Sequence, residues 1–336
     1  MTSPQTNGKK LRREIGKGVG AMVSVFFNAV SAVVVLLLLM AVGYWMGQLG
    51  WMGSSEKKFL GKYLINIAVP CNCLTGILNN LDRSMLSQAA MMLANCMLGV
   101  VLNFAIGMTI AAAMKIQRNR WGVFVSMLAL PNSLFIGLPM CTQLFGEVCV
   151  PYVMLYYLSN TIFTQSVALL LVERSGSVKK EKQGVGKAIL ALVSKPPIVA
   201  MAVSLVLLVS GIRPPEFIMS FAKYISGSVS PLALMYCGCI VCELGLKNLR
   251  FQRGLGVMMV FRLVLAPILC AFMCRFSGIT GLAHDVFVVS SGLPVVTQIT
   301  VMAGTYGADE QYAATGATFT TLGCFLTIPV IMVLLA

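Results

Sequence analysis

The sequence predicts an all-α integral membrane protein with ten transmembrane helices, arranged as two inverted repeats of five helices. Composition predicts the membrane, because 58% of the 336 residues are hydrophobic and only 11% are charged, whereas soluble domains carry about 25% charged residues. Length predicts the number of spans, since about ten segments of about 20 residues fill such a chain. Prolines that recur in both halves predict the repeats.

The ten spans are read from apolar runs bounded by short polar or basic stretches. The expected spans are residues 22–47, 57–79, 84–114, 121–145, 149–172, 196–212, 217–245, 252–276, 284–306 and 309–335. So much of the chain lies in these spans that no room is left for a sizeable soluble domain. The activity is therefore expected to take place within the lipid bilayer.

A polar stretch divides the ten spans into two sets of five. It contains "ERSGSVKKEKQGVGK", a composition typical of a flexible, solvated linker. The predicted organisation is a basic N-terminal tail (1–21), a first repeat with helices 1–5 (22–172), a cytoplasmic linker loop (173–195) and a second repeat with helices 6–10 (196–336).

The two halves resemble each other at matching positions. Pro70 has a counterpart 161 residues on in Pro231, and Pro131 has one 163 residues on in Pro294. The strings "VFVSMLALP" and "VFVVSSGLP", which end at Pro131 and Pro294, match at five of nine positions. Because five is an odd number, the second copy must enter the membrane from the opposite side. Inverted repeats of this kind are typical of many secondary transporters.

The basic residues predict the orientation. With the N-terminus outside, the cytoplasmic loops hold 15 lysines and arginines against nine outside, as the positive-inside rule favours. The count places the linker loop in the cytoplasm and the chain in the cell membrane as a multi-pass protein. Five of the nine outside residues belong to the N-terminal tail, whose role the rule does not explain. Because most of the lysines and arginines lie in loops, where this rule explains them, the net charge of +14 does not indicate binding to nucleic acid.

The fourth and ninth spans are predicted to be broken at mid-membrane and to cross. Proline interrupts the helical hydrogen bonds, and lipid cannot satisfy the freed backbone groups, so such breaks line a cavity or lie within protein. Each freed helix N-terminus favours an anion. The alternative is that the prolines only kink the helices. The candidate substrate-binding residues are Pro131, Asn132, Ser133, Asn160, Pro294, Thr297 and Gln298.

Other polar residues in the spans allow two interpretations. Asn95, Asn103 and Gln165, like Asn160, face either the site or a neighbouring helix, where polar side chains join helices. Arg262 is either functional, as intramembrane charges usually are, or extends along its helix to reach the membrane surface.

Nothing in the sequence indicates an enzyme. The single histidine, the absence of metal-ligand spacing and the absence of G-x-S-x-G favour no catalytic or metal site. No cofactor is expected, and the coupling ion, H⁺ or Na⁺, stays open because no carboxylate lies near a span centre. Gly43 and Gly47 form a GxxxG motif that serves either packing within the chain or a homodimer.

Three strings together resemble the auxin efflux carrier family of ten-span transporters. They are "AVGYWMGQLGWMGSSEKKFLGKYLINIAVPCNCLTGIL", "LALPNSLFIGLPMCTQLFG" and the segment from "RLVLAPILCAFMCRFSG" to "FLTIPVIMVLL". The resemblance covers nearly the whole chain and implies an elevator-type carrier of organic anions. It implies a scaffold of spans 1, 2, 6 and 7, and a moving unit of the other six that crosses at Pro131 and Pro294. Asn132 follows the family pattern; Val295 departs from it, which favours a small carboxylate over auxin.

The expected function is therefore secondary transport of a small organic anion. Two alternatives stay open: a sodium-coupled symporter of the bile-acid type, and a membrane channel or sensor.

Overall fold

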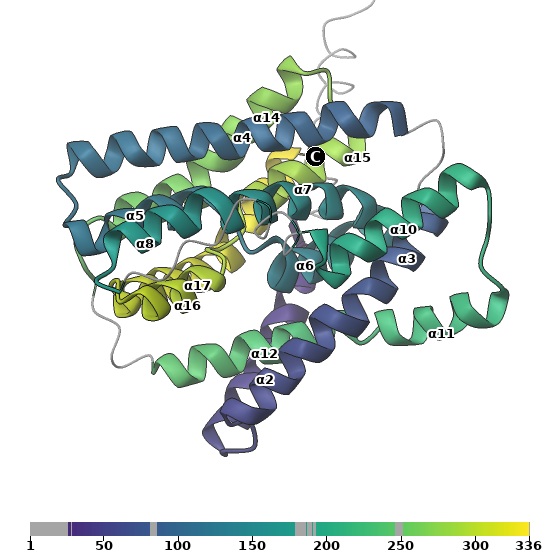
Figure 1. Cartoon of the computed structure of the whole chain (residues 1–336), viewed down its shortest axis with the longest axis horizontal. Helices are drawn as coiled ribbons and strands as arrows, with labels where there is room; N and C mark the ends of the chain where they lie inside the picture. The colour runs from purple at the N-terminus through teal and green to yellow at the C-terminus, as the bar shows by residue number, and fades with distance from the viewer. Residues whose placement is uncertain are drawn as a thin grey trace, which may run out of the picture.

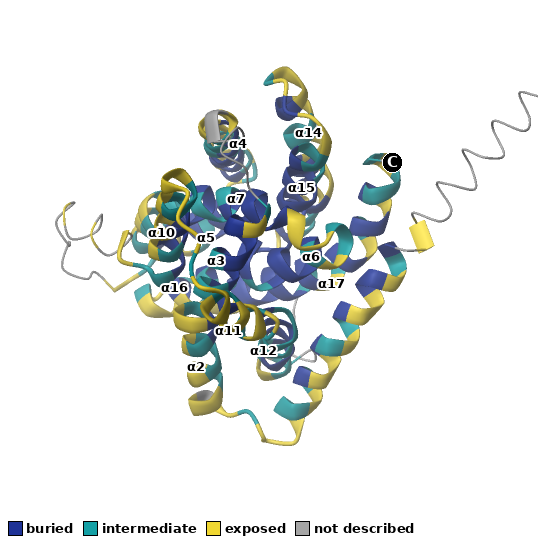
Figure 2. Cartoon of the chain, turned by 90° about the vertical axis from the view of Figure 1, so that its right-hand side faces the viewer, coloured by how far each residue is buried: buried dark blue, intermediate teal, exposed yellow. Residues whose placement is uncertain are grey.

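The computed structural model describes residues 26–27, 29–80, 86–178, 186, 190, 193–245 and 251–335. Within these ranges the chain is helical and forms no β-strand. The predicted tail (1–21) lies outside the described residues, as does most of the predicted linker (173–195). Buried residues gather in the centre of the molecule, while many outer helical faces are exposed (Figure 2). Many of the exposed side chains on those faces are large and apolar, as expected for helices that contact lipid.

The first half of the chain begins with a helix over Ala29–Gln48. The elements that follow it are α2 (Ser54–Tyr63), η1 (Leu64–Ala68), α3 (Val69–Asn80), α4 (Leu86–Ala113), α5 (Arg118–Ala129), η3 (Ser133–Gly137), α6 (Leu138–Phe145), η4 (Glu147–Cys149), α7 (Val150–Phe163), η5 (Thr164–Ala168) and α8 (Leu169–Ser175).

The described residues of the second half are helical as well. Its elements are α10 (Pro196–Ser210), α11 (Glu216–Ser226), α12 (Val229–Leu244), α13 (Leu255–Val260), η7 (Phe261–Leu265), α14 (Ala266–Phe276), α15 (Gly281–Ser291), α16 (Gln298–Tyr306) and α17 (Glu310–Leu335).

Six of the described helices are long and apolar enough to cross a membrane. They are Ala29–Gln48, Gln88–Ala113, Glu147–Ser175, Glu216–Glu243, Leu255–Phe276 and Glu310–Leu335. Of the four other predicted spans, two are interrupted at prolines, one is the 15-residue α10, and one carries three lysines and four asparagines over residues 54–80. The structure is therefore that of a multi-pass, all-helical membrane protein, and the count of ten spans stays a prediction.

The described helices pack as two groups. In the first, α3 lies against α10 and α11, and α12 lies against α2. In the second, α5 lies against α4, α8 and α17, and α14 lies against α15. Figure 1 shows α3, α10 and α11 at one side of the molecule and α5, α8, α16 and α17 at the other. The groups meet where α3 touches α7 and where α12 touches η3 and α6.

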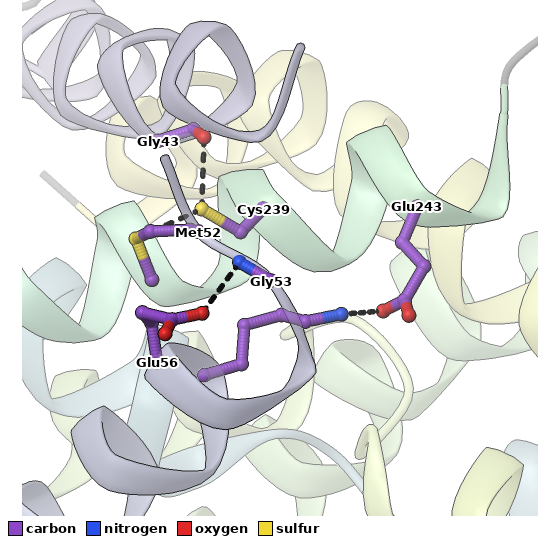
Figure 3. Close-up of polar contacts among 7 residues, drawn as sticks. Gly43, Met52, Gly53, Glu56, Cys239 and Glu243 are labelled. Atoms are coloured by element: carbon purple, nitrogen blue, oxygen red, sulfur yellow. Dashed lines mark hydrogen bonds and ion pairs between the residues drawn. The ribbon is translucent and has the colours of Figure 1, made fainter. Parts of the chain in front are cut away.

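Glycines bring the first helix into backbone contact with α12. A Cβ on Gly43 would lie 2.0 Å from the carbonyl oxygen of Met235, and one on Gly238 would lie 1.9 Å from that of Met40. The Cys239 thiol donates a hydrogen bond of 2.8 Å to the Gly43 carbonyl (Figure 3). The GxxxG motif thus serves packing within the chain, one of its two predicted uses.

Polar contacts also join the start of α2 to the end of α12. Lys57 on α2 forms an ion pair with Glu243 on α12 (Figure 3). The preceding residue, Glu56, caps α2, since its carboxylate accepts a 2.9 Å hydrogen bond from the backbone N–H of Gly53. The ion pair therefore joins α2 to α12, and the cap fixes the start of α2.

Candidate substrate-binding site

The first break follows from the chemistry of its own residues. α5 ends at Ala129, and Leu130 has an extended backbone (φ −114°, ψ 111°), as expected for a residue that precedes proline. Asn132 then starts the next helical segment, since its side-chain oxygen accepts a 3.2 Å hydrogen bond from the Phe135 N–H. The second break runs from the end of α15 at Ser291 to the start of α16 at Gln298.

The two breaks pair with each other through their backbones. The Asn132 N–H donates to the Pro294 carbonyl at 2.7 Å, and the Val296 N–H donates to the Leu130 carbonyl at 3.1 Å. Pro131 and Val295 therefore form an isolated antiparallel bridge. Each break thus satisfies one backbone N–H and one carbonyl of the other, which helps to explain how irregular backbone persists in this apolar setting.

Side chains of three elements fix the first break. The Asn132 amide donates to the Thr297 hydroxyl at 3.2 Å, across the crossing. From α7, the Asn160 amide donates to the Pro131 carbonyl at 3.2 Å and to the Ser133 hydroxyl at 3.1 Å. Five of the seven predicted site residues thus take part in these hydrogen bonds: Pro131, Asn132, Ser133, Asn160 and Thr297.

A cavity of about 480 Å³ lies beside the crossing. All the predicted site residues except Pro294 line it; Pro294 is buried and contributes its carbonyl to Asn132 instead. Sequence reasoning missed the remaining wall, which comes from both groups of helices. Those residues are Gly61, Ile65, Asn66, Leu134, Phe135, Tyr157, Thr161, Thr164, Lys195, Pro196, Tyr236, Val296 and Val301.

The other polar candidates lie away from this cavity. Asn95 on α4 bonds across to α14, donating to the Cys274 thiol at 3.5 Å and accepting from the Ser277 hydroxyl at 2.9 Å. Asn103 is buried on the same helix, and Gln165 lies on η5; neither lines the cavity. Asn95 thus joins helices, one of the two interpretations that the sequence allowed.

Arg262 does not extend to the surface, so that interpretation is wrong. Its side chain is fully buried, with 0% exposure. The guanidinium donates one hydrogen bond to the Leu128 carbonyl at 3.0 Å and another to the Ser291 carbonyl. Leu128 lies in the last turn of α5 and Ser291 ends α15, so one side chain caps both interrupted helices.

The crossing itself explains why these two carbonyls need a donor. In an unbroken helix Leu128 would accept from the N–H of Asn132, and Ser291 from that of Val295. The Asn132 N–H is turned to the other break, and the Val295 N–H donates to the Thr320 hydroxyl at 3.1 Å. Arg262 replaces both missing donors, and its charge offsets the negative ends of two helix dipoles.

Four turns of π-helix lie within the described residues, and each bears on this region. They are η1, η3, η5 and η7. Residues of η1, η3 and η5 line the cavity, and η7 carries Arg262. Turns of this kind re-aim side chains and occur often at functional sites.

The described residues contain no group of three or more histidines, cysteines, aspartates or glutamates that could hold a metal ion. Hydroxyls gather instead in a second, small cavity of about 20 Å³ beside the crossing, lined by Thr297, Thr300, Thr318 and Thr321 among others.

An all-helical chain with six apolar membrane-length helices and two broken segments that meet at a cavity defines a polytopic membrane protein of the transporter class. The profile of the "membrane transport protein" family matches residues 28–332. The chain therefore belongs to this family, the auxin efflux carrier family, as the sequence strings predict.

Two archaeal proteins are similar to this chain over most of their length. An uncharacterized transporter of Methanocaldococcus jannaschii is 25% identical over 304 residues, covering 89% of this chain and 96% of its own. An uncharacterized transporter of Methanothermobacter thermautotrophicus is 25% identical over 320 residues, covering 93% of this chain and 100% of its own.

Proposed function

We propose that this protein is a secondary transporter that moves a small organic anion across the cell membrane. The observation that carries the proposal is the cavity of about 480 Å³, whose wall includes residues of both breaks. A site where two interrupted helices meet is a recurrent feature of secondary transporters. Membership of a transporter family supports the same class of activity.

The chemistry of the wall favours an anion. The cavity is lined by the amides of Asn132, Asn160 and Gln298 and by several hydroxyls, and none of the described residues in its wall is an aspartate or glutamate. Two helical segments, η3 and α16, begin at this wall, and the positive ends of helix dipoles favour negative charge. Phe135, Tyr157 and other apolar groups would surround the hydrocarbon part of the substrate.

The two groups of helices support an elevator-type movement. The breaks, α7 and Arg262 belong to the second group, whereas α3, α10 and α12 belong to the first. In the proposed cycle the second group carries the anion along the first, which stays fixed in the bilayer. The proposal includes ten spans in two inverted repeats, an N-terminus outside, a cytoplasmic linker and coupling to H⁺ or Na⁺.

Uptake of labelled monocarboxylates and dicarboxylates into proteoliposomes tests the proposal. We expect uptake by the wild type and at least a tenfold loss in Asn132→Ala, since that side chain both caps η3 and reaches Thr297. Asn103→Ala is the matched control, because Asn103 is equally buried yet lies outside the cavity. Unchanged uptake in Asn132→Ala would refute the assigned role.

A sodium-coupled symporter is the second candidate. The small cavity lined by four threonines is large enough for one water-sized occupant, and hydroxyl and carbonyl oxygens suit a hard cation. Uptake that requires Na⁺ in the wild type and loses this requirement in Thr318→Val would favour it. Uptake that is indifferent to Na⁺ would exclude it.

A further inference from the structure

Lys195, which the sequence assigns to a loop, is one of the residues that line the cavity. It directly precedes Pro196, which lines the cavity as well. The Lys195 carbonyl accepts hydrogen bonds from the N–H groups of Ile198 at 2.9 Å and Val199 at 3.0 Å. Lys195 is thus the N-cap of α10, and its backbone is held by the helix rather than by the linker before it.

The described residues that line the cavity offer this cation no anionic partner. Among them, Lys195 is the one lysine or arginine, and none is an aspartate or glutamate. The ion pairs within the described residues join Lys57 to Glu243, Arg120 to Asp309 and His284 to Asp285, and do not involve Lys195. Partial burial lowers the pKa of Lys195 below its ordinary value, because it disfavours the charged form.

The rest of the wall near Lys195 is suited to an apolar body. Tyr236 on α12 and Phe135 on η3 stack with ring centroids 5.3 Å apart, one from each group of helices. Both rings line the cavity, together with Ile65 and Val301. A ligand that fills this space therefore meets apolar and aromatic surface, amides and hydroxyls, and a single full charge.

We propose that Lys195 is the charge-recognition residue of the site, whose ammonium group binds the carboxylate of a monoanionic, partly apolar substrate. This inference rests on the proposed function and specifies the ligand charge that the same cavity selects. One cation matches one carboxylate, whereas a second carboxylate on the ligand would meet no second full positive charge among the described residues of the wall. A neutral amide of the same shape would gain little from Lys195.

The position of Lys195 also makes its contribution depend on the state of the transporter. Lys195 precedes α10, in the first group of helices, while Asn132, Asn160 and Thr297 belong to the second. When the second group moves, the anion leaves Lys195 behind. Lys195 therefore strengthens binding on the side of the membrane that the linker occupies.

Calorimetric titration of the purified full-length protein tests the inference, with benzoate, phenylacetate and cyclohexanecarboxylate and the amide of each as probes. We expect Lys195→Gln to raise the Kd of the carboxylates about tenfold and to leave the Kd of any amide that binds unchanged. Lys195→Arg should restore carboxylate binding to within about threefold, because it restores the charge. Lys62→Gln is the control, since Lys62 lies on α2 beside Gly61 but outside the cavity wall.

The outcomes separate this inference from the proposal on which it rests. A wild type that binds none of the three carboxylates overturns both. Carboxylate binding that is unchanged in Lys195→Gln, or that weakens equally for acid and amide, overturns the role of Lys195 and leaves the transport site standing. Binding of the dianion phthalate as tightly as benzoate overturns the preference for a single charge.

Discussion

Replacing Arg262 with methionine tests how the crossing is held together. The change removes two charged hydrogen bonds, to the carbonyls of Leu128 and Ser291. At about 1.5–3 kcal/mol each, their loss amounts to about 3–6 kcal/mol. Removing the buried guanidinium also removes the free-energy cost of its desolvation, which opposes this loss. In the wild type, however, that cost is already partly offset by the two helix C-termini, each of which carries about −0.5 charge. We therefore expect a net destabilisation of about 3 kcal/mol.

Thermal unfolding in detergent, followed with a thiol-reactive dye, measures this loss, because most of the cysteines are buried. Arg262→Lys should fall between the wild type and Arg262→Met, since a single ammonium keeps the charge but cannot reach both carbonyls. Arg275→Met, an exposed change on α14 next to η7, should melt like the wild type. If Arg262→Met also melts like the wild type, the capping argument is wrong.

Three further predictions concern charge, packing and the second break. Benzoate affinity should fall by about tenfold as rising pH deprotonates Lys195, and the fall should occur at a pH below the pKa of an ordinary lysine. Lys195→Arg should remove this fall. If the cavity tyrosines caused it instead, the fall would occur in both proteins. Gly238→Ala should abolish stable folding, since its Cβ would lie 1.9 Å from a backbone oxygen, while Gly99→Ala, with 3.6 Å available, should be tolerated in the same melting assay. Thr320→Val should destabilise the protein by about 1–3 kcal/mol, because the buried Val295 N–H loses its acceptor.

Local signals allowed prediction of the breaks. Pro131 and Pro294 lack the N–H that a continuous helix needs, so both interruptions are visible in the sequence. Asn132 directly after the first proline is a strong N-cap, and it caps η3 as such a residue should. The inverted repeats and the ten spans remain predictions, as does the family's division into scaffold and moving unit.

Long-range partners could not be predicted. Arg262 bonds to Leu128, 134 residues away, and nothing local to η7 indicates which carbonyls lack donors. Lys195 looked like one basic residue among many in a polar linker, because only the packing of α10 brings it to the cavity. The π-helical turns have no sequence signal that we recognise, yet they place much of the cavity wall.

A cryo-electron microscopy structure of the protein with 4-bromobenzoate bound tests the central claim most directly. The account predicts ligand density at the crossing, in the cavity lined by Asn132, Thr297 and Lys195. Density only in another cavity, of about 300 Å³ and lined by Arg213 and Lys223 among others, would contradict it.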